Sequence, residues 1–309
     1  MTVPTRAAGG KVEAVERKPL QLEAEAKPVN NLHGRTVLAI VLTHDAPEAL
    51  RTCLTAVCAQ TTPPAGVLVV DNASTPPATE VVEGLVQHAV PISVLRLPDN
   101  RGPAGGHAAG LKEFLKASHD LGWIFDDDCV PEPDCLTRLL EEEARDHHHP
   151  AAIFPTQVDR HGTVQNYPAW FGVLLSKEVV RTVGLPMEAL FWWTEDTEYL
   201  QWRIPRAGFP VRRSTGARVI HFGVRRKAYK PAWKFYYETR NSVFYRLYIQ
   251  RCRRLYRLGP YFIRTLLRIS LQEDQRLRKL AVVGIGACHG IVGRLGKTMP
   301  VTKQESGRD

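Results

Sequence analysis

Short apolar runs alternate with helical patterns between residues 36 and 126. Four runs have the length and β-branched content of buried strands, at residues 36–42, 66–70, 92–97 and 121–125. Between them, apolar residues recur at helical spacing over about 47–58, 78–88 and 103–117. Strands and helices that alternate in this way form βαβ units around a parallel sheet. The pattern therefore predicts an α/β fold whose ligand site lies beyond the carboxyl ends of the strands.

Polar side chains follow these predicted strands at the points where they end: Thr43, Asp71, Asn100 and the run Asp126-Asp127-Asp128. Because parallel strands end at one edge of a sheet, we expect these side chains to converge on one crevice. Three adjacent carboxylates repel one another, and a divalent cation removes that cost. Oxygen ligands suit Mg²⁺ or Mn²⁺, which typically bridge carboxylates to the phosphates of a substrate. The alternative is a solvated acidic turn.

Three further segments carry candidate chemistry. The glycine-rich residues 99–106 precede a helix and form either a loop that approaches a phosphate or a plain connection. Residues 192–198, WWTEDTE, place acids beside two tryptophans. They form either an apolar cleft that tunes a catalytic carboxylate and stacks on sugars, or a helix start capped by Thr194. His221 follows a predicted strand and is either structural or a ligand beside the aspartates.

In chain order, the motifs VLTHDAP, VVDNAS, NRGPAGG, FDDD, TEDTE and VIHFG resemble those of family 2 inverting glycosyltransferases of the GT-A fold. Within that family the chain most resembles the bacterial rhamnosyltransferase and galactofuranosyltransferase branch. The match runs from about Thr36 to Gly223, and continues more loosely through residues 237–241 and 289–296. The resemblance implies a mostly parallel central sheet with flanking helices and a C-terminal helical extension.

The resemblance also implies a role for each matching residue. The residues expected to bind the nucleotide and the donor are Thr43, Asp71, Asn72, Asn100, Gly105, Gly106, Asp126 and Asp127. The expected ligands of Mn²⁺ or Mg²⁺ are Asp126, Asp128 and His221. Asp196 matches the general base, and Glu195 or Glu198 takes that role if the alignment is shifted. The residues expected at the acceptor are Trp192, Trp193 and Glu195.

These roles predict a metal-dependent hexosyltransferase that moves rhamnose or galactofuranose from a dTDP- or UDP-linked donor. The acceptor is the hydroxyl of a glycan, a lipid-linked glycan or a small natural product. A nucleotidyltransferase would also use aspartates and a metal, but no basic, glycine-rich triphosphate loop follows the first strand. A non-catalytic protein that binds carbohydrate or a lipid carrier would not need the full set of acids.

Charge divides the 309 residues unevenly. From Arg225 to the end there are 20 basic and 5 acidic residues, whereas residues 1–224 hold 21 basic and 27 acidic ones. We therefore expect a flexible tail at 1–33, a catalytic domain at 34–224 and a basic, aromatic helical region at 225–309. The last region suits an anionic membrane surface or a phosphate-rich partner, or is a solvated helical face. It contains no recognised nucleic-acid-binding motif, so no nucleic-acid partner is expected.

The remaining features concern location and thiols. No apolar run reaches about 18 residues and no signal peptide precedes the first strand, which predicts a cytoplasmic protein, peripheral on the inner face of the membrane if the basic region docks there. The glycine-spaced residues 280–295 form either a close-packed helix or a helix at a membrane surface. The six cysteines form no CxxC pair and are expected to be reduced and mostly buried, and His147–His149 to be a surface loop.

Overall fold

The computed structural model describes residues 34–85, 89–146, 151–159, 161–222, 229–252 and 255–301. The expected tail at 1–33, the histidine run at 147–149 and the expected domain boundary after residue 224 lie outside these ranges. The division into domains therefore stays a prediction.

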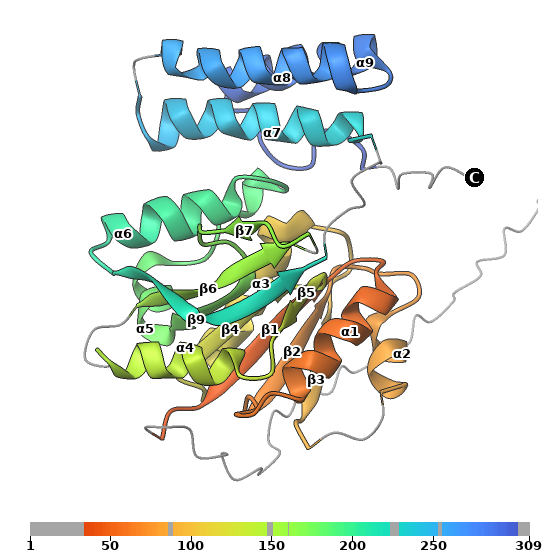
Figure 1. Ribbon diagram of the computed structural model, residues 1–309. Coiled ribbons are helices and arrows are strands. Elements are labelled where there is room, and N and C mark those ends of the chain that lie inside the picture. Colours follow the sequence, from red (N-terminus) through yellow and green to blue (C-terminus); the bar gives the residue numbers. More distant parts are fainter. Residues whose placement is uncertain are drawn as a thin grey trace, which may run out of the picture.

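The first half of the chain alternates strands and helices, as the sequence predicts (Figure 1). Its elements are β1 Val37–Thr43, α1 Pro47–Cys58, β2 Gly66–Asp71, α2 Ala78–Glu83, β3 Ile92–Arg96, α3 Gly102–Lys116 and β4 Leu121–Asp126. Strand β1 pairs in parallel with β2 and β4, and β2 pairs in parallel with β3. Helix α2 ends at Glu83, earlier than expected, with residues 86–88 outside the described ranges. The α/β prediction is confirmed.

The second half adds strands that make the sheet mixed. They are β5 Cys129–Pro131, β6 Ala152–Asp159, β7 Val164–Gln165, β8 Phe171–Ser176 and β9 Val211–His221. The order is β3-β2-β1-β4-β8-β6-β9-β5, with β7 paired to β6. Strand β8 is antiparallel to β4, whereas β9 runs parallel to β6. Strand β5 pairs with the end of β9, which brings Cys129 opposite His221 and so joins the acidic run to the histidine.

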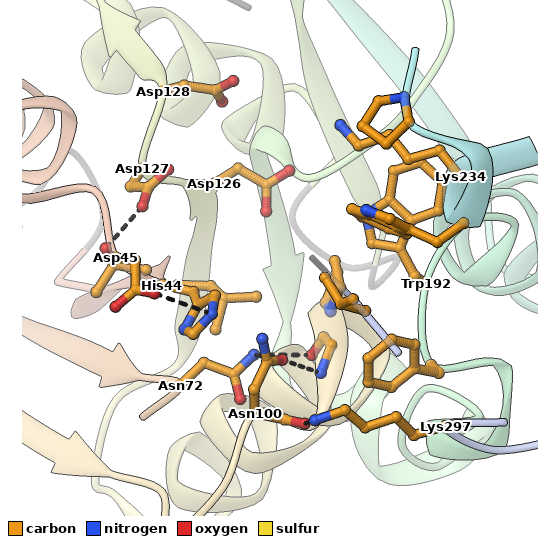
Figure 2. A pocket seen from close by; sticks show the side chains of 18 residues that line it. His44, Asp45, Asn72, Asn100, Asp126, Asp127, Asp128, Trp192, Lys234 and Lys297 are labelled. Carbon is orange, nitrogen blue, oxygen red and sulfur yellow. Dashed lines mark hydrogen bonds and ion pairs between the residues drawn. The ribbon is translucent and has the colours of Figure 1, made fainter. Parts of the chain in front are cut away.

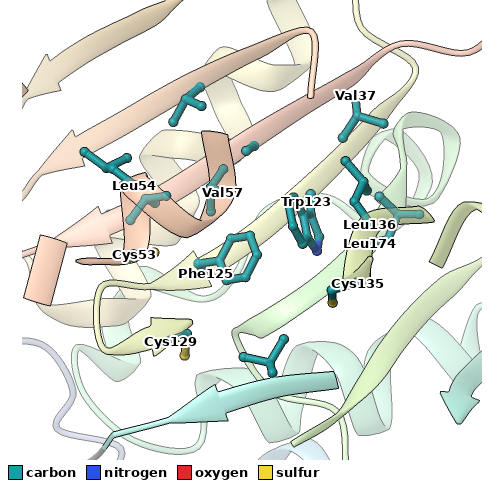
Figure 3. Packing of buried hydrophobic residues seen from close by; sticks show 14 of the residues in the cluster. Val37, Cys53, Leu54, Val57, Trp123, Phe125, Cys129, Cys135, Leu136 and Leu174 are labelled. Carbon is teal, nitrogen blue, oxygen red and sulfur yellow. The ribbon is translucent and has the colours of Figure 1, made fainter. Parts of the chain in front are cut away.

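Helices cover both faces of the sheet, which explains why its strands are continuous apolar runs. Alternate residues of β1 enter different clusters: Val37, Ala39 and Val41 face one side, whereas Leu38, Ile40 and Leu42 face the other. On the first side they meet α1, Trp123, Phe125 and α4 (Cys135–Ala144), as Figure 3 shows. On the other side lie α3, α5 (Lys177–Val183) and the short α6 (Ile204–Arg206).

The C-terminal helices form a layer beyond the sheet (Figure 1). They are α7 Ala232–Phe244, α8 Gly259–Gln272 and α9 Arg276–Ile291. Helix α9 packs closely on α7 because two glycines face it: a Cβ at Gly286 would lie 2.7 Å from the Tyr236 carbonyl oxygen, and one at Gly290 2.5 Å from that of Arg240. Of the two alternatives for residues 280–295, the structure shows close packing through Gly286 and Gly290, in a helix that ends at Ile291. The other alternative, a helix at a membrane surface, stays a prediction. No helix within the described ranges is long and apolar enough to cross a membrane.

All six cysteines are free thiols, as predicted. Cys53, Cys129 and Cys135 are buried, Cys58 and Cys252 are half-buried, and Cys288 is exposed. Burial therefore holds for three of the six rather than for most of them.

Candidate active site

A cleft of about 770 Å³ opens at the carboxyl ends of β1, β2 and β4. Its lining from the first half of the chain includes Leu42, Thr43, His44, Asp45, Asn72, Asn100, Gly102, Pro103 and Asp126–Asp128. Its lining from the second half is Phe191, Trp192, Pro231, Trp233, Lys234, Lys297 and Val301. The structure thus brings together most of the strand-end residues that the sequence singled out, and adds residues from the C-terminal region (Figure 2).

Asp127 lies at the back of the acidic run and is tied to the first strand. The Thr43 hydroxyl donates to Asp127 Oδ2 at 2.6 Å. Burial raises the pKa of Asp127 to about 7; Asp128 and Asp126 add to the effect, whereas the bond from Thr43 opposes it. Asp127 is therefore held in place by β1 rather than pointing freely into solvent.

Asp126 has a histidine partner that the sequence analysis missed. His107, on α3, is fully buried, and its Nε2 lies 2.9 Å from Asp126 Oδ1. Its ring stacks on Trp170 at a centroid distance of 4.6 Å. The only clue in the sequence is a polar residue among the small residues of 104–110. His107 fixes the orientation of the first aspartate of the run.

Asp128 and His221 form the part of the site best suited to a metal. His221 Nε2 lies 3.0 Å from Asp128 Oδ2, and the Gln157 amide nitrogen lies 2.9 Å from the other ring nitrogen, Nδ1. One ligand atom each from Asp128, Cys129 and His221 lie within 4.8 Å of one another. Although burial lowers it, the hydrogen bond and charge of Asp128 raise the pKa of His221.

This donor set fits Mn²⁺ or Mg²⁺. Carboxylate oxygen is the ligand these ions prefer, and the contact of the Gln157 amide with Nδ1 helps to fix the orientation of the imidazole. Cys129 is a poor third ligand because burial raises the pKa of its thiol well above the usual value. Asp126 lies at the same strand end and lines the cleft, with Oδ1 engaged by His107.

Three predicted donor-site residues do not line the cleft. Asp71 is fully buried; its carboxylate accepts from the backbone amides of Ser74 and Ala78 and pairs with Arg96 at 2.5 Å. Gly105 and Gly106 lie inside α3. A Cβ at Gly106 would lie 2.3 Å from the Leu42 side chain, and one at Gly105 2.5 Å from Arg101 Cβ. In this structure these residues serve packing and loop geometry.

The loop before Glu195 and Asp196 has an unusual backbone. The backbone has positive φ values at three residues: 61° at Phe191, 72° at Trp193 and 77° at Thr194. Residues other than glycine rarely adopt this backbone conformation. Thr194 precedes the helix as expected, and its carbonyl accepts from Glu198 N at 2.8 Å. Its φ is not the extended value of an ordinary cap. Such a loop persists only where its surroundings hold it.

Two buried residues of α7 hold this loop. Asn241 Nδ2 donates to the carbonyl oxygens of Leu190, Trp192 and Trp193 at 2.8–2.9 Å. Arg240 donates to the Leu190 carbonyl at 2.8 Å and to the Gly296 carbonyl at 2.6 Å. The sequence analysis noted these residues only within the loose match at 237–241. They are positioning residues for the loop that carries Trp192 into the cleft.

The acids of this loop have different surroundings. Asp196 accepts from the Thr197 backbone amide at 2.5 Å, and burial, with Asp126, raises its pKa, while His107 and the bonds from Thr197 oppose the shift. Glu195 is buried, and this burial, together with the charge of Asp196, raises its pKa well above normal. Within the described ranges its Oε2 has no hydrogen-bond partner. Glu198 forms an ion pair with Arg203. Asp196 is therefore the acid best suited to accept a proton.

The two tryptophans differ in their relation to the cleft. Trp192 lines it, whereas Trp193 is 46% exposed and is absent from the lining, as is Glu195. The indole rings stack with centroids 5.2 Å apart. An aromatic surface therefore continues from the cleft toward solvent.

Two lysines of the C-terminal region line the cleft: Lys234 lies across from the acidic run, and Lys297 lies beside Asn100 (Figure 2). Lys234 Nζ lies over the Trp192 and Trp233 rings, at 5.2 and 5.4 Å from the centroids. Burial and Lys230 lower the pKa of Lys234, and Asp128 opposes the shift. Lys297 Nζ donates to the Asn100 carbonyl at 3.2 Å. The sequence analysis treated this region as a surface and missed both.

Comparison with known proteins decides the family. Residues 38–210, more than half of the chain, match the model of glycosyl transferase family 2. The chain belongs to this family. Family membership confirms the expected glycosyltransferase and favours it over a nucleotidyltransferase or a protein that only binds carbohydrate.

Curated relatives of this glycosyltransferase align over a limited region. The chain is 36% identical over 115 residues to galactofuranosyltransferase GlfT1 of Mycolicibacterium smegmatis, which is 37% of each chain. It is also 36% identical over 95 residues, 30% of each chain, to GlfT1 of Mycobacterium tuberculosis. The alignments thus span about a third of the length of these relatives.

Solved structures support the GT-A fold. Staphylococcus aureus TarS 1–349 in complex with UDP-GlcNAc has a TM-score of 0.56 at 15% identity, covering 84% of this chain and 82% of that one. The mannosyltransferase PcManGT from Pyrobaculum calidifontis, in complex with GDP-Man and Mn²⁺, has a TM-score of 0.53 at 15% identity, covering 83% and 75%. The expected GT-A fold with added C-terminal helices is confirmed.

Proposed function

We propose that this glycosyltransferase moves galactofuranose from a UDP-linked donor to the hydroxyl of a glycan acceptor, with inversion. The observation that supports the reaction is that Asp126–Asp128 line one cleft together with Trp192 of the acidic loop. Behind this lining, His221 contacts Asp128, and the charge of Asp126 acts on Asp196. The choice of sugar is supported by the curated relatives, which are named galactofuranosyltransferases. Rhamnose from a dTDP-linked donor is the second candidate, because the motifs also resemble rhamnosyltransferases.

The donor would lie between the strand ends and the C-terminal wall. Thr43 and Asn72, which line the cleft, would contact the nucleoside, and Asp127, held by Thr43, would face the donor sugar. Asn72 accepts from the Arg101 amide and donates to Asn100, which shapes the loop beside the diphosphate. Asp128 and His221, with Asp126, would hold Mn²⁺ or Mg²⁺, which when bound offsets the negative charge of the diphosphate.

The transfer requires an acceptor oxygen that loses its proton as it attacks the anomeric carbon. Asp196 takes that proton, because its raised pKa makes its carboxylate a stronger base than an ordinary aspartate. The bond from the anomeric carbon to the diphosphate oxygen breaks as the new glycosidic bond forms, and the nucleoside diphosphate leaves. Lys234 and Lys297 face the departing charge, and Trp192 offers a flat apolar surface to the acceptor sugar.

Thermal denaturation with nucleotides tests the donor site. The protein is heated with UDP, dTDP, GDP or CDP, each with Mn²⁺ or with EDTA. A ligand at 100 times its dissociation constant stabilises the fold by about 2.7 kcal/mol. We expect a metal-dependent rise with UDP; a rise with dTDP alone would favour rhamnose transfer. If no diphosphate raises the midpoint, the proposed donor site is wrong.

A further inference from the structure

The outer helices α8 and α9 carry an unusual number of exposed apolar side chains. They hold eight of the fifteen large apolar residues that are exposed in the described part of the chain, with exposed fractions from 41% to 85%. These are Ile263, Leu266, Leu267 and Leu271 on α8, and Leu277, Ile285, Ile291 and the adjoining Val292 on or next to α9. Exposed apolar surface on this scale marks an interaction site more often than a solvated face.

The exposed residues of α8 follow helical spacing. Positions 263, 266, 267 and 271 fall on one side of the helix. Phe262 and Ile269 instead pack into the cluster formed with Phe235 and Val282. Helix α8 therefore buries one apolar face against its neighbours and presents a second one outward, which no part of the chain that the structure describes covers.

The part of α9 that follows Lys279 carries no Asp, Glu, Lys or Arg. This stretch extends to Gly293, and Ala281, Gly284 and Cys288 are exposed beside the larger apolar residues. Helix α9 also contacts α8 directly. The two helices thus offer apolar faces next to each other.

Exposed arginines surround these faces: Arg264, Arg268, Arg276, Arg278 and Arg294. Residues 255–301 contain only two acids, Glu273 and Asp274, and both bind the ammonium group of the buried Lys279. Glu273 also pairs with Arg268, which leaves the other four arginines of the group without a carboxylate from this segment. Apolar side chains ringed by cations and poor in exposed carboxylates match the interface of a bilayer that contains anionic lipids. Long arginine side chains can reach headgroups while their stems stay on the apolar surface.

We propose that the exposed faces of α8 and α9 dock this enzyme on an anionic lipid bilayer. The apolar side chains would enter the interfacial region and the arginines would meet the phosphates. A second copy of the chain fits less well, because a twofold contact through this patch brings its own arginines together. The docking depends on neither the donor nor the acceptor proposed above.

The docking would bring the cleft close to the membrane surface. Helix α7 lies between the sheet and the outer helices (Figure 1), and its residues Trp233 and Lys234 line the cleft. Packed helices lie about 8–10 Å apart, so the cleft is roughly one helix layer from the bilayer. This consequence, which rests on the proposed function, suits an acceptor that is anchored in lipid.

Co-sedimentation of the full chain with vesicles tests the docking. Phosphatidylcholine vesicles with about 30% phosphatidylglycerol are compared with pure phosphatidylcholine, at low salt and at about 0.5 M salt. We expect binding to the anionic vesicles that weakens at high salt. The double variants Leu267→Asn with Leu271→Asn, and Arg264→Gln with Arg276→Gln, should each lower the partition coefficient about tenfold.

Matched controls lie on the sheet and directly after α4. Val164→Asn removes an equally exposed apolar residue of β7, and Arg145→Gln removes an exposed arginine; both should bind vesicles like the wild type. In both double variants, the midpoint of thermal unfolding and its rise with UDP and Mn²⁺ should stay unchanged. This result would show that the variants lose docking while they keep the fold and the donor site.

Two results would overturn the proposal. One is a wild-type protein that does not bind anionic vesicles at low salt. The other is unchanged binding in both double variants. If the wild type ignores vesicles but Leu267→Asn with Leu271→Asn turns a dimer into a monomer in sedimentation velocity, the patch joins copies of the chain instead.

Discussion

At the scale of single residues, the surroundings of each acid decide its chemistry. Asp196, Glu195 and Glu198 are close in sequence, yet Glu198 is bound to Arg203 and Glu195 is buried with its pKa raised well above normal. Asp196 alone combines a raised pKa with electrostatic coupling to Asp126 and His107. The assignment of the base therefore rests on burial and partners rather than on the motif.

The first prediction concerns removal of this base. We expect Asp196→Asn to lower kcat by about 10²–10⁴ while UDP and Mn²⁺ still raise the unfolding midpoint, because only the proton acceptor is lost. Steady-state kinetics and thermal denaturation measure the two effects. Asp134→Asn, an exposed carboxylate at the start of α4, is the control and should keep full activity. Normal turnover in Asp196→Asn would contradict the assignment.

The second prediction concerns pH. Because burial and Asp126 raise the pKa of Asp196, kcat at saturating donor and Mn²⁺ should fall as pH drops through a value above the usual 3.8 of an aspartate. The deprotonated form is the active one, so the rate reaches a plateau at higher pH. A pH–rate profile that stays flat down to pH values near 3.8 would exclude Asp196 as the base.

At the scale of elements, α7 is the frame of the active-site loop. Its buried Arg240 and Asn241 hold carbonyls from both the loop at 190–194 and the segment at 296. Since the loop has three non-glycine residues with positive φ, it needs these donors to keep its shape.

The third prediction removes one of these donors. Asn241→Ala should destabilise the fold by about 1–3 kcal/mol, because buried carbonyls lose their hydrogen bonds. It should also lower kcat more than it raises the dissociation constant of UDP, since the loop carries the base. Urea denaturation and single-turnover kinetics measure these effects. Unchanged kcat in the folded variant would show that the loop keeps its position without Asn241.

The fourth prediction compares two glycines of α9. Gly290→Ala should destabilise by about 1–3 kcal/mol, because its Cβ would lie 2.5 Å from the Arg240 carbonyl and force the helices apart. Gly284→Ala, on the exposed side with open space around it, should instead stabilise by roughly 0.5–1 kcal/mol. Urea denaturation distinguishes them, and equal effects would mean that α9 does not pack on α7 through its glycines.

At the scale of the whole molecule, the two ends of the described chain build one cleft. Asn100 and Lys297 are almost two hundred positions apart, yet the lysine donates to the asparagine carbonyl. The segment is held there because Tyr237 Oη donates to the Met299 carbonyl and Arg240 to that of Gly296. The C-terminal helices are therefore part of the site and not an appendage.

The fifth prediction tests this wall. Lys297→Ala should weaken UDP binding about fivefold, because an exposed charge contact contributes about 1 kcal/mol. Binding of uridine, which lacks the phosphates, should stay the same. Isothermal titration calorimetry with both ligands measures the difference. Lys116→Ala, an exposed lysine at the end of α3, is the control. An equal loss for uridine and UDP would mean that Lys297 supports the cleft without meeting phosphate.

Local pattern was enough to predict the βαβ half of the fold and the place of the site. The apolar run of β1 has no alternation because both of its faces are covered, and Thr43 and Asp126 lie at strand ends that any parallel sheet brings together. The glycine spacing of α9 left close packing and a membrane surface as alternatives, and the structure shows why Gly286 and Gly290 must be small, since α7 approaches both.

Distant contacts were decided by the tertiary structure alone. Asp71 and Asp127 both lie at strand ends. The Asp71 carboxylate is bound by a backbone amide and by Arg96, whereas Asp127 lines the cleft. Three contacts join segments that are far apart in the sequence: β9 pairs with β5, His107 contacts Asp126, and Lys297 donates to the Asn100 carbonyl. No periodic pattern in the sequence predicts such contacts. Periodicity reports which face of an element is buried, but only packing determines which side chains meet there.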